Sequence, residues 1–185
     1  PCYCDETMAN VYATASTAGF VRELAAYEQM GIPQHVRPSA PVRVANRGAL
    51  GMERQAQFNP LKLLFGLLGL MPSVDVYEHA FVRDVSGSTA RTDRGSVTAG
   101  HIVFASHYPL VNVPGLYFVK EHQERSYALA LEGAPLVDGM FIGDAGGFSF
   151  RTYGDFLLVG GGGHRTRQGP KPTAGYAKIR AFADA

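Results

Sequence analysis

The glycine residues of this chain constrain its fold more than any other feature. The sequence holds 22 glycines in 185 residues, and they are dense after residue 130, with four in a row at 160–163. Because glycine interrupts helices and accepts positive φ, this spacing is typical of short strands joined by tight turns. The C-terminal half is therefore predicted to be an antiparallel meander, with strands near residues 117–121, 125–131, 140–143, 148–152 and 156–160.

Two amphipathic segments carry helix signals. Apolar residues from Phe20 onward follow helical spacing after the N-cap candidates Ser16 and Thr17, and Gly31 closes that segment. A second helix is expected over about residues 173–183, at the end of the chain.

A third helix is expected to begin at Pro60. Proline suits the first helical position because its missing N–H would have no partner there, and Asn59 can serve as the N-cap. The segment runs to about Met71 and is apolar nearly all round, so we expect it to be buried on most faces.

Further strands are expected where alternating or β-branched residues lie between turn residues. No strand is expected in the polar stretch 46–59. The apolar run 101–105, in contrast, is typical of a strand in a parallel sheet that is buried on both faces. The other expected strands are residues 11–15, 42–45, 75–79, 81–85, 90–92 and 96–98, with turns at 86–88 and 93–95. The elements together predict an α+β fold, in which a mixed, largely antiparallel sheet and its packed helices form one structural unit over residues 1–185.

The composition excludes several classes of protein. With 17 basic and 16 acidic residues the formal net charge is +1, so no basic surface for nucleic acid is expected. The longest apolar run, 61–71, contains Lys62 and is too short to cross a bilayer of about 30 Å, and no signal peptide opens the chain. We therefore expect a cytoplasmic protein without membrane or nucleic-acid partners.

The cysteines predict no metal centre. Cys2 and Cys4 are the only two, and no CxxC pair exists that could complete a zinc site. They could bind a metal only with histidine or aspartate from elsewhere in the chain. Two reduced thiols are the expectation.

The order of the central elements resembles a known superfamily. A proline-capped helix is followed by residues 74–85, by 91–99 with the turn Thr-Asp-Arg-Gly, and by 101–107, which end in Phe-Ala-Ser-His-Tyr. This order resembles the second half of the FAD domain in the D-amino-acid-oxidase-like superfamily. Residues 112–133 and 156–166 (Phe-Leu-Leu-Val-Gly-Gly-Gly-Gly-His-Arg-Thr) are similar to a bacterial branch of FAD-dependent oxidoreductases.

The resemblance covers about residues 42–180 and implies a function. The chain would be the substrate-binding side of an FAD-dependent oxidoreductase that oxidises a C–N bond in an amine or amino-acid-like small molecule. Residues 1–58 and 112–172 would belong to the substrate domain and residues 59–111 to the later part of the FAD-binding domain. The alternative is a non-catalytic ligand-binding or assembly module that retains the sheet without FAD.

One motif of such proteins is absent. A dinucleotide-binding turn requires G-x-G-x-x-G between a strand and a helix, because only glycine lets the backbone approach the pyrophosphate. The four glycines at 160–163 lead into a loop sequence and do not replace it. We therefore expect an internal region whose intact parent binds FAD through the remainder of the FAD domain. The chain alone is expected to bind FAD weakly or not at all and to lack turnover.

The resemblance implies candidate cofactor contacts. Val82 lies where such proteins offer backbone hydrogen bonds to adenine, although it could instead be a core valine. Ala105 and Ser106 are small residues at the expected carboxyl end of a strand, and His107 could act as a hydrogen-bond donor or base near neutral pH. All three could instead belong to an ordinary loop.

A substrate carboxylate would require an arginine with a hydroxyl nearby. Arg125, Tyr127 and Arg151 lie on expected strands and are the candidates, and the first two should share one face because they are two residues apart. They could also form a solvated cross-strand pair on an outer face, and the facing of Arg151 is ambiguous. His164 and Arg165, beside the glycines, could bind an anion or form a surface loop. No catalytic residue is assigned.

Overall fold

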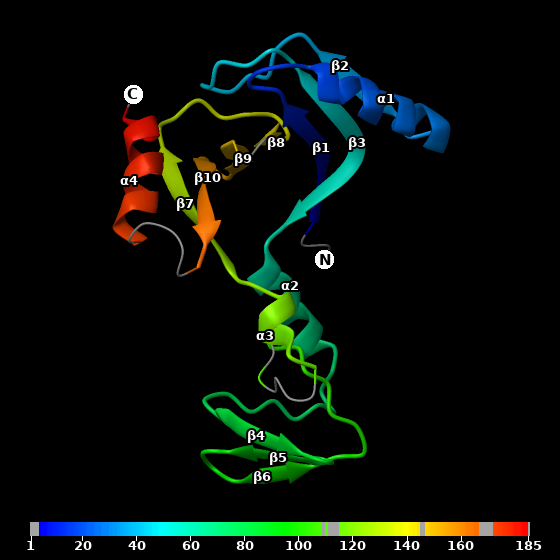
Figure 1. Cartoon of the computed structure of the whole chain (residues 1–185), viewed down its shortest axis with the longest axis vertical. Coiled ribbons are helices and arrows are strands. Elements are labelled where there is room, and N and C mark those ends of the chain that lie inside the picture. Colours follow the sequence, from blue (N-terminus) through cyan, green and yellow to red (C-terminus); the bar gives the residue numbers. More distant parts are fainter. Residues whose placement is uncertain (1–3, 109, 111–114, 145–146, 167–171, 185) are drawn as a thin grey trace. The chain divides into compact units, whose positions relative to one another are not determined.

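The computed structural model describes residues 4–108, 110, 115–144, 147–166 and 172–184. Its contacts divide the chain into a larger unit, residues 1–65 with 125–185, and a smaller unit, residues 66–124. The described residues form a seven-stranded sheet, a three-stranded sheet and four helices (Figure 1). This confirms the α+β class with a mixed, largely antiparallel sheet, whereas the domain boundaries expected from the sequence stay predictions.

The seven-stranded sheet belongs to the larger unit and has the strand order β2-β3-β1-β8-β9-β10-β7. Strands β1 and β8 are parallel, and the pairs β1–β3, β2–β3, β8–β9 and β9–β10 are antiparallel. The expected C-terminal meander is therefore confirmed over β8, β9 and β10. The strands are β1 Cys4–Tyr12, β2 Gln34–Arg37, β3 Ala49–Phe58, β7 Glu124–Glu132, β8 Met140–Gly143, β9 Ser149–Tyr153 and β10 Phe156–Arg165.

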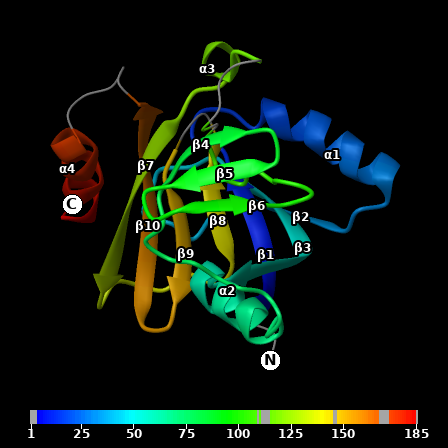
Figure 2. The same cartoon turned by 90° about the horizontal axis from the view of Figure 1, so that it is seen from below.

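Two helices pack against this sheet at opposite ends (Figure 2). Helix α1 (Ala18–Met30) begins where the Ser16 hydroxyl accepts a hydrogen bond from the Ala18 N–H at 3.1 Å, and it ends at left-handed Gly31, as expected. Its Phe20 packs with Leu50 of β3. Helix α4 (Pro172–Ala183) buries Ile179 completely.

Strand alternation places these helices on opposite faces of the sheet. Tyr12 pairs with Ala49, and both lie in the core cluster that contains Ile179 of α4. Their neighbours Val11 and Leu50 also pair, and Leu50 packs with α1. Successive strand residues point to opposite faces, so α4 and α1 cover different sides. The core on the α4 side also contains Tyr127, Phe141, Phe150, Leu157 and Val159.

The smaller unit contains the three-stranded sheet β4-β5-β6, formed by Val82–Ser86, Thr89–Thr92 and Ser96–Thr98. The expected turns at 86–88 and 93–95 join these strands, with Gly87 at φ 56° and Gly95 at φ 155°. Helix α2 (Pro60–Gly69) crosses the boundary between the two units, and Asn59 caps it as expected. The Asn59 Oδ1 accepts hydrogen bonds from the N–H groups of Leu61 and Lys62, each at 3.1 Å.

Two predictions for the N-terminal third were wrong. Residues 42–45 form no strand, because the Asn46 side chain bonds the Ala40 backbone N–H at 2.8 Å and the Val44 carbonyl at 2.8 Å, which holds this segment as a compact loop. The polar stretch 46–59 instead contains β3, one of the longest strands. In the C-terminal half of β3, apolar and polar residues do not alternate, because side chains on both faces of the strand are at least partly exposed there.

Four further expectations failed in or beside the smaller unit. Residues 101–105 are irregular, with Val103 86% exposed, because no strand in the described part of the chain pairs with them. Residues 75–79 are also irregular, and residues 117–121 contain the short helix α3 (Tyr117–Lys120). Helix α2 forms as expected, but none of its residues is buried. An apolar helix becomes buried only where other elements cover it.

The phenol of Tyr12 ties β1 to the β8–β9 connection. Tyr12 is fully buried and donates a hydrogen bond to the Phe148 carbonyl at 2.7 Å. A β-carbon on Gly143 would lie 2.8 Å from the Tyr12 hydroxyl oxygen, so glycine makes room for this contact. Burial, followed by the negative charge of Asp144, raises the pKa of Tyr12 from 10.0 to about 12.

This pKa predicts a loss of stability in alkali. Between about pH 10 and pH 12 the unfolded chain loses the Tyr12 proton while the folded chain keeps it, so the free energy of unfolding falls as the pH rises. Tyr12→Phe should remove part of that fall, while costing about 1 kcal/mol at neutral pH because the Phe148 carbonyl loses its donor. Urea unfolding at a series of pH values measures both effects. The control is Tyr176→Phe, at a half-exposed ring, and identical alkaline slopes for Tyr12→Phe and the unsubstituted chain would contradict the assignment.

Candidate functional site

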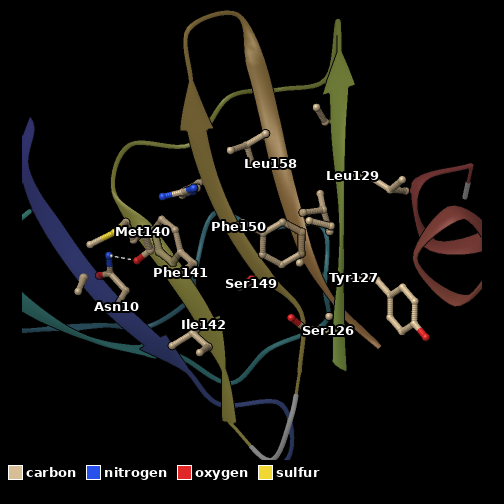
Figure 3. Close-up of a pocket in the computed structure, with 17 residues that line it drawn as sticks. Asn10, Ser126, Tyr127, Leu129, Met140, Phe141, Ile142, Ser149, Phe150 and Leu158 are labelled. Carbon is tan, nitrogen blue, oxygen red and sulfur yellow. Dashed lines mark hydrogen bonds between the residues drawn. The ribbon is translucent and has the colours of Figure 1, made fainter. Parts of the chain in front are cut away.

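A groove of about 790 Å³ lies on the seven-stranded sheet (Figure 3). Residues of β1, β7, β8, β9 and β10 line it, so it belongs wholly to the larger unit. The side chains on its floor alternate with the core residues Phe141, Phe150 and Val159, which point toward the α4 side. The groove therefore occupies the sheet face opposite α4.

Strand register orders the sheet face that carries the groove into rows. In one row Val11 pairs with Ile142, Ile142 with Ser149, and Ser149 with Gly160. In the next row Ala9 pairs with Met140, and Arg151 pairs with Leu158. Strand β9 thus contributes polar residues to the middle of the floor, and its neighbours contribute apolar or small ones.

Among the described residues that line the groove, Arg151 is the only charged one. It forms no ion pair with a carboxylate among the described residues. Arg151 is exposed, and Met140 and Leu158 are its apolar neighbours on the groove floor. A guanidinium among apolar side chains matches the chemistry of a small molecule that carries a carboxylate and an apolar portion.

The structure separates the three residues expected to bind substrate. Arg125 and Tyr127 share one face of β7, as their spacing predicts, and the buried Tyr127 ring is directed toward α4 (Figure 3). Arg151 shares its face with Ser149, in the groove. The structure therefore does not bring the two arginines together, and the binding role of each residue stays a prediction.

The Tyr127 side chain is held between the sheet and α4. Its hydroxyl lies 2.9 Å from His164 Nε2, and its ring meets the Tyr176 ring edge-on with centroids 4.8 Å apart. The other ring nitrogen of His164 lies 3.0 Å from the Arg165 carbonyl, so it donates there and Nε2 accepts from Tyr127. His164 and Arg165 lie on β10, where a loop was the alternative to an anion site.

Val82 lies at the start of edge strand β4, opposite Thr92. The Thr92 N–H bonds the Gly95 carbonyl at 2.7 Å, on the side away from β4, whereas the Asp93 N–H bonds Phe81 at 3.2 Å. Because opposed residues of an antiparallel pair alternate, the Val82 N–H and C=O point to the open edge of this sheet. A backbone hydrogen bond to a ligand is geometrically available there.

The other cofactor candidates lie in an exposed irregular segment. Ala105, Ser106 and His107 are all exposed, and His107 has φ 65°. The Ser106 hydroxyl donates to the Tyr108 carbonyl at 2.7 Å. The expected strand end that would have placed them at a sheet edge is absent, so their role stays a prediction.

Sequence reasoning missed Ser149, whose hydroxyl lies in the groove (Figure 3). A period-two argument places it with Arg151, but only the burial of Phe148 and Phe150 against α4 identifies which face is open. The described residues contain no group of three or more histidine, cysteine, aspartate or glutamate side chains that could hold a metal. Cys2 lies outside the described residues. Among the helices of the described chain, none is long and apolar enough to span a membrane.

Known structures share this fold. The chain resembles glycine oxidase from Geobacillus kaustophilus (TM-score 0.70, 17% identity, 90% of this chain and 50% of that one). It also resembles glycine oxidase from Bacillus cereus ATCC 14579 (TM-score 0.71, 14% identity, 97% and 55%) and L-proline dehydrogenase from P. horikoshii (TM-score 0.66, 12% identity, 98% and 58%). The chain therefore shares its fold with about half of each of these amino-acid oxidoreductases, which confirms the resemblance at the level of fold.

The sequence comparisons are less specific. No family model matches the chain. A curated Bacillus subtilis (strain 168) protein, named "Putative Rieske 2Fe-2S iron-sulfur protein YhfW", is 28% identical over 173 residues, which cover 86% of this chain and 34% of that protein. The chain thus spans about a third of this curated relative and about half of each solved structure.

The contact between α4 and Tyr127 yields a prediction. Gly175 is buried in α4, and a β-carbon there would lie 2.0 Å from the Tyr127 ring. Gly175→Ala must displace α4 or the ring and should cost about 1–3 kcal/mol of unfolding free energy. The control Gly19→Ala meets nothing within 4 Å in α1, so it should be neutral or stabilise by up to about 1 kcal/mol. Urea unfolding measures both, and an equally stable Gly175→Ala chain would contradict this packing.

Proposed function

We propose that this chain is the substrate-binding side of an FAD-dependent oxidoreductase that oxidises a C–N bond of an amine or amino-acid-like small molecule. The carrying observation is Arg151, an arginine without an ionic partner among the described residues, in a groove with apolar neighbours. The shared fold with two glycine oxidases and a proline dehydrogenase supports the same proposal. Each of those enzymes is named for an amino acid.

The groove residues have defined tasks in this proposal. Arg151 pairs with the substrate carboxylate and thereby fixes one end of the molecule. Met140, Ile142 and Leu158 contact its apolar part and displace water. None of the described residues that line the groove is an aspartate, glutamate or histidine, so in this proposal the amine arrives neutral or releases its proton to solvent.

The cofactor would be shared between this chain and the remainder of the FAD domain. FAD, when bound, would supply the acceptor for a hydride from the carbon next to the substrate nitrogen. The open backbone groups of Val82 fit a hydrogen bond to its adenine. We propose that Ala105, Ser106 and His107 also contact the cofactor. All three are exposed, and the first two have small side chains. In this proposal residues 1–58 and 112–172 belong to the substrate domain and residues 59–111 to the FAD domain.

We also propose how the isolated chain behaves and where the intact protein acts. The chain alone binds FAD weakly or not at all and has no turnover, because no G-x-G-x-x-G motif occurs in it. The intact protein acts in the cytoplasm, on small molecules, without nucleic-acid or membrane partners; the near-neutral charge supports this.

Flavin content tests the proposal. The complete gene product that carries this chain should be yellow, with the visible absorption bands of oxidised flavin, after purification or after FAD addition. The control is the 185-residue chain alone, which should stay colourless under the same conditions. A folded, complete protein that remains colourless with added FAD would contradict the proposal and favour the alternative, a non-catalytic ligand-binding or assembly module.

The groove arginine predicts a difference between two variants. Arg151→Leu in the complete protein should raise the KM for an anionic amino-acid substrate more than tenfold, equivalent to about 1.4 kcal/mol, because it removes the carboxylate partner. Arg180→Leu is the matched control, since Arg180 is an exposed arginine of α4 and does not line the groove. Steady-state kinetics measure both. Equal effects of the two substitutions would remove Arg151 from the proposed substrate site.

A further inference from the structure

Gly160 has one specific neighbour in the groove. It pairs with Ser149 between β9 and β10. A β-carbon on residue 160 would lie 2.5 Å from Ser149 Oγ, and its next nearest neighbour would be the Tyr127 carbonyl oxygen at 3.7 Å. The missing side chain at position 160 therefore leaves the space around the Ser149 hydroxyl open.

The Ser149 hydroxyl forms no hydrogen bond within the described part of the fold. Ser149 is half-buried, yet its Oγ has no hydrogen-bond partner among the residues that the structure describes. A hydroxyl that is partly removed from water and has no protein partner is available to donate to a ligand. Ser149 also lies two residues before Arg151, so both point into the groove, with Cα atoms about 7 Å apart by strand geometry.

We propose that Ser149 is a substrate-binding residue and that Gly160 keeps its hydroxyl accessible. The Ser149 hydroxyl donates to one oxygen of a carboxylate whose other oxygen pairs with Arg151. This inference rests on the proposed function and narrows it, because such a site selects amino acids with a free carboxylate over simple amines. Met140, Ile142 and Leu158, beside these residues, favour an apolar amino-acid side chain.

Two analogues of phenylalanine, each lacking one of its charged groups, serve as probes for this site. Hydrocinnamate keeps its carboxylate and ring but lacks the amine, and phenethylamine keeps the amine and ring but lacks the carboxylate. Neither probe needs to be oxidised, so isothermal titration calorimetry on the complete protein measures their dissociation constants without any activity. Flavin content is recorded separately, and failure of the proposed function therefore appears in a different measurement.

Ser149→Ala should weaken hydrocinnamate binding about tenfold and leave phenethylamine unchanged, because only the carboxylate loses a charged hydrogen bond. Gly160→Ala should produce a similar loss, since the new β-carbon forces the Ser149 hydroxyl to rotate away. The double variant should bind hydrocinnamate no more weakly than either single variant, because both changes act through one hydroxyl. The control Ser39→Ala, at an exposed loop residue, should leave both constants unchanged.

Three results would overturn the proposal. The first is an unsubstituted protein that does not bind hydrocinnamate. The second is a loss in Ser149→Ala that is equal for hydrocinnamate and phenethylamine, or absent for both. The third is an additive, roughly hundredfold loss in the double variant, because independent effects multiply and would show that Gly160 does not act through Ser149.

Discussion

The parallel pairing of β1 with β8 is the constraint on which the larger unit depends. Ala9 to Tyr12 pair with Met140 to Gly143, about 130 residues later in the chain. Without this pairing the sheet would divide into β2-β3-β1 and β8-β9-β10-β7. Side chains reinforce it, since Asn10 Nδ2 donates to the Met140 carbonyl at 3.1 Å and the Thr14 hydroxyl donates to Asp144 at 2.9 Å.

The same pairing determines where a ligand can bind. Because paired residues point to the same side, the register carries one facing pattern from Val11 through Ile142 to Ser149 and Gly160. A slip by one residue would turn Ser149 and Arg151 toward the α4 side and expose Phe150. The buried Phe150 and Val159 therefore fix the register of the groove as well as the core.

The sequence predicted features that depend on neighbouring residues. Asn59 before Pro60, Gly31 after α1, and the strands around residues 125–165 follow from local chemistry, and the structure contains them. Prediction from the sequence failed where strand pairing decides whether a segment becomes a strand. Strand β3 forms in a polar segment because β1 and β2 both bond to it, whereas the apolar segment 101–105 has no pairing strand among the described residues.

The groove itself could be predicted only in part. Period two correctly grouped Arg125 with Tyr127, but no local pattern reveals that α4 covers that face and leaves the Arg151 face open. That information resides in contacts between distant residues, such as Ile179 of α4 with the core that contains Phe150 and Val159. The facing of a strand residue becomes predictable only when the layer that covers one side is known.

The glycine run at 160–163, which dominated the sequence, illustrates the same limit. It was expected to end a strand, yet β10 continues through it to Arg165. A β-carbon on Gly161 would lie 2.6 Å from the Phe148 ring, and one on Gly162 would lie 3.2 Å from the Gly175 carbonyl of α4. These glycines therefore let α4 and the Phe148 ring approach β10 closely, while Gly160 leaves room on the groove face. The glycines of β10 leave space for neighbouring groups on both faces of the strand. From composition alone, such glycines cannot be distinguished from the glycines of a turn.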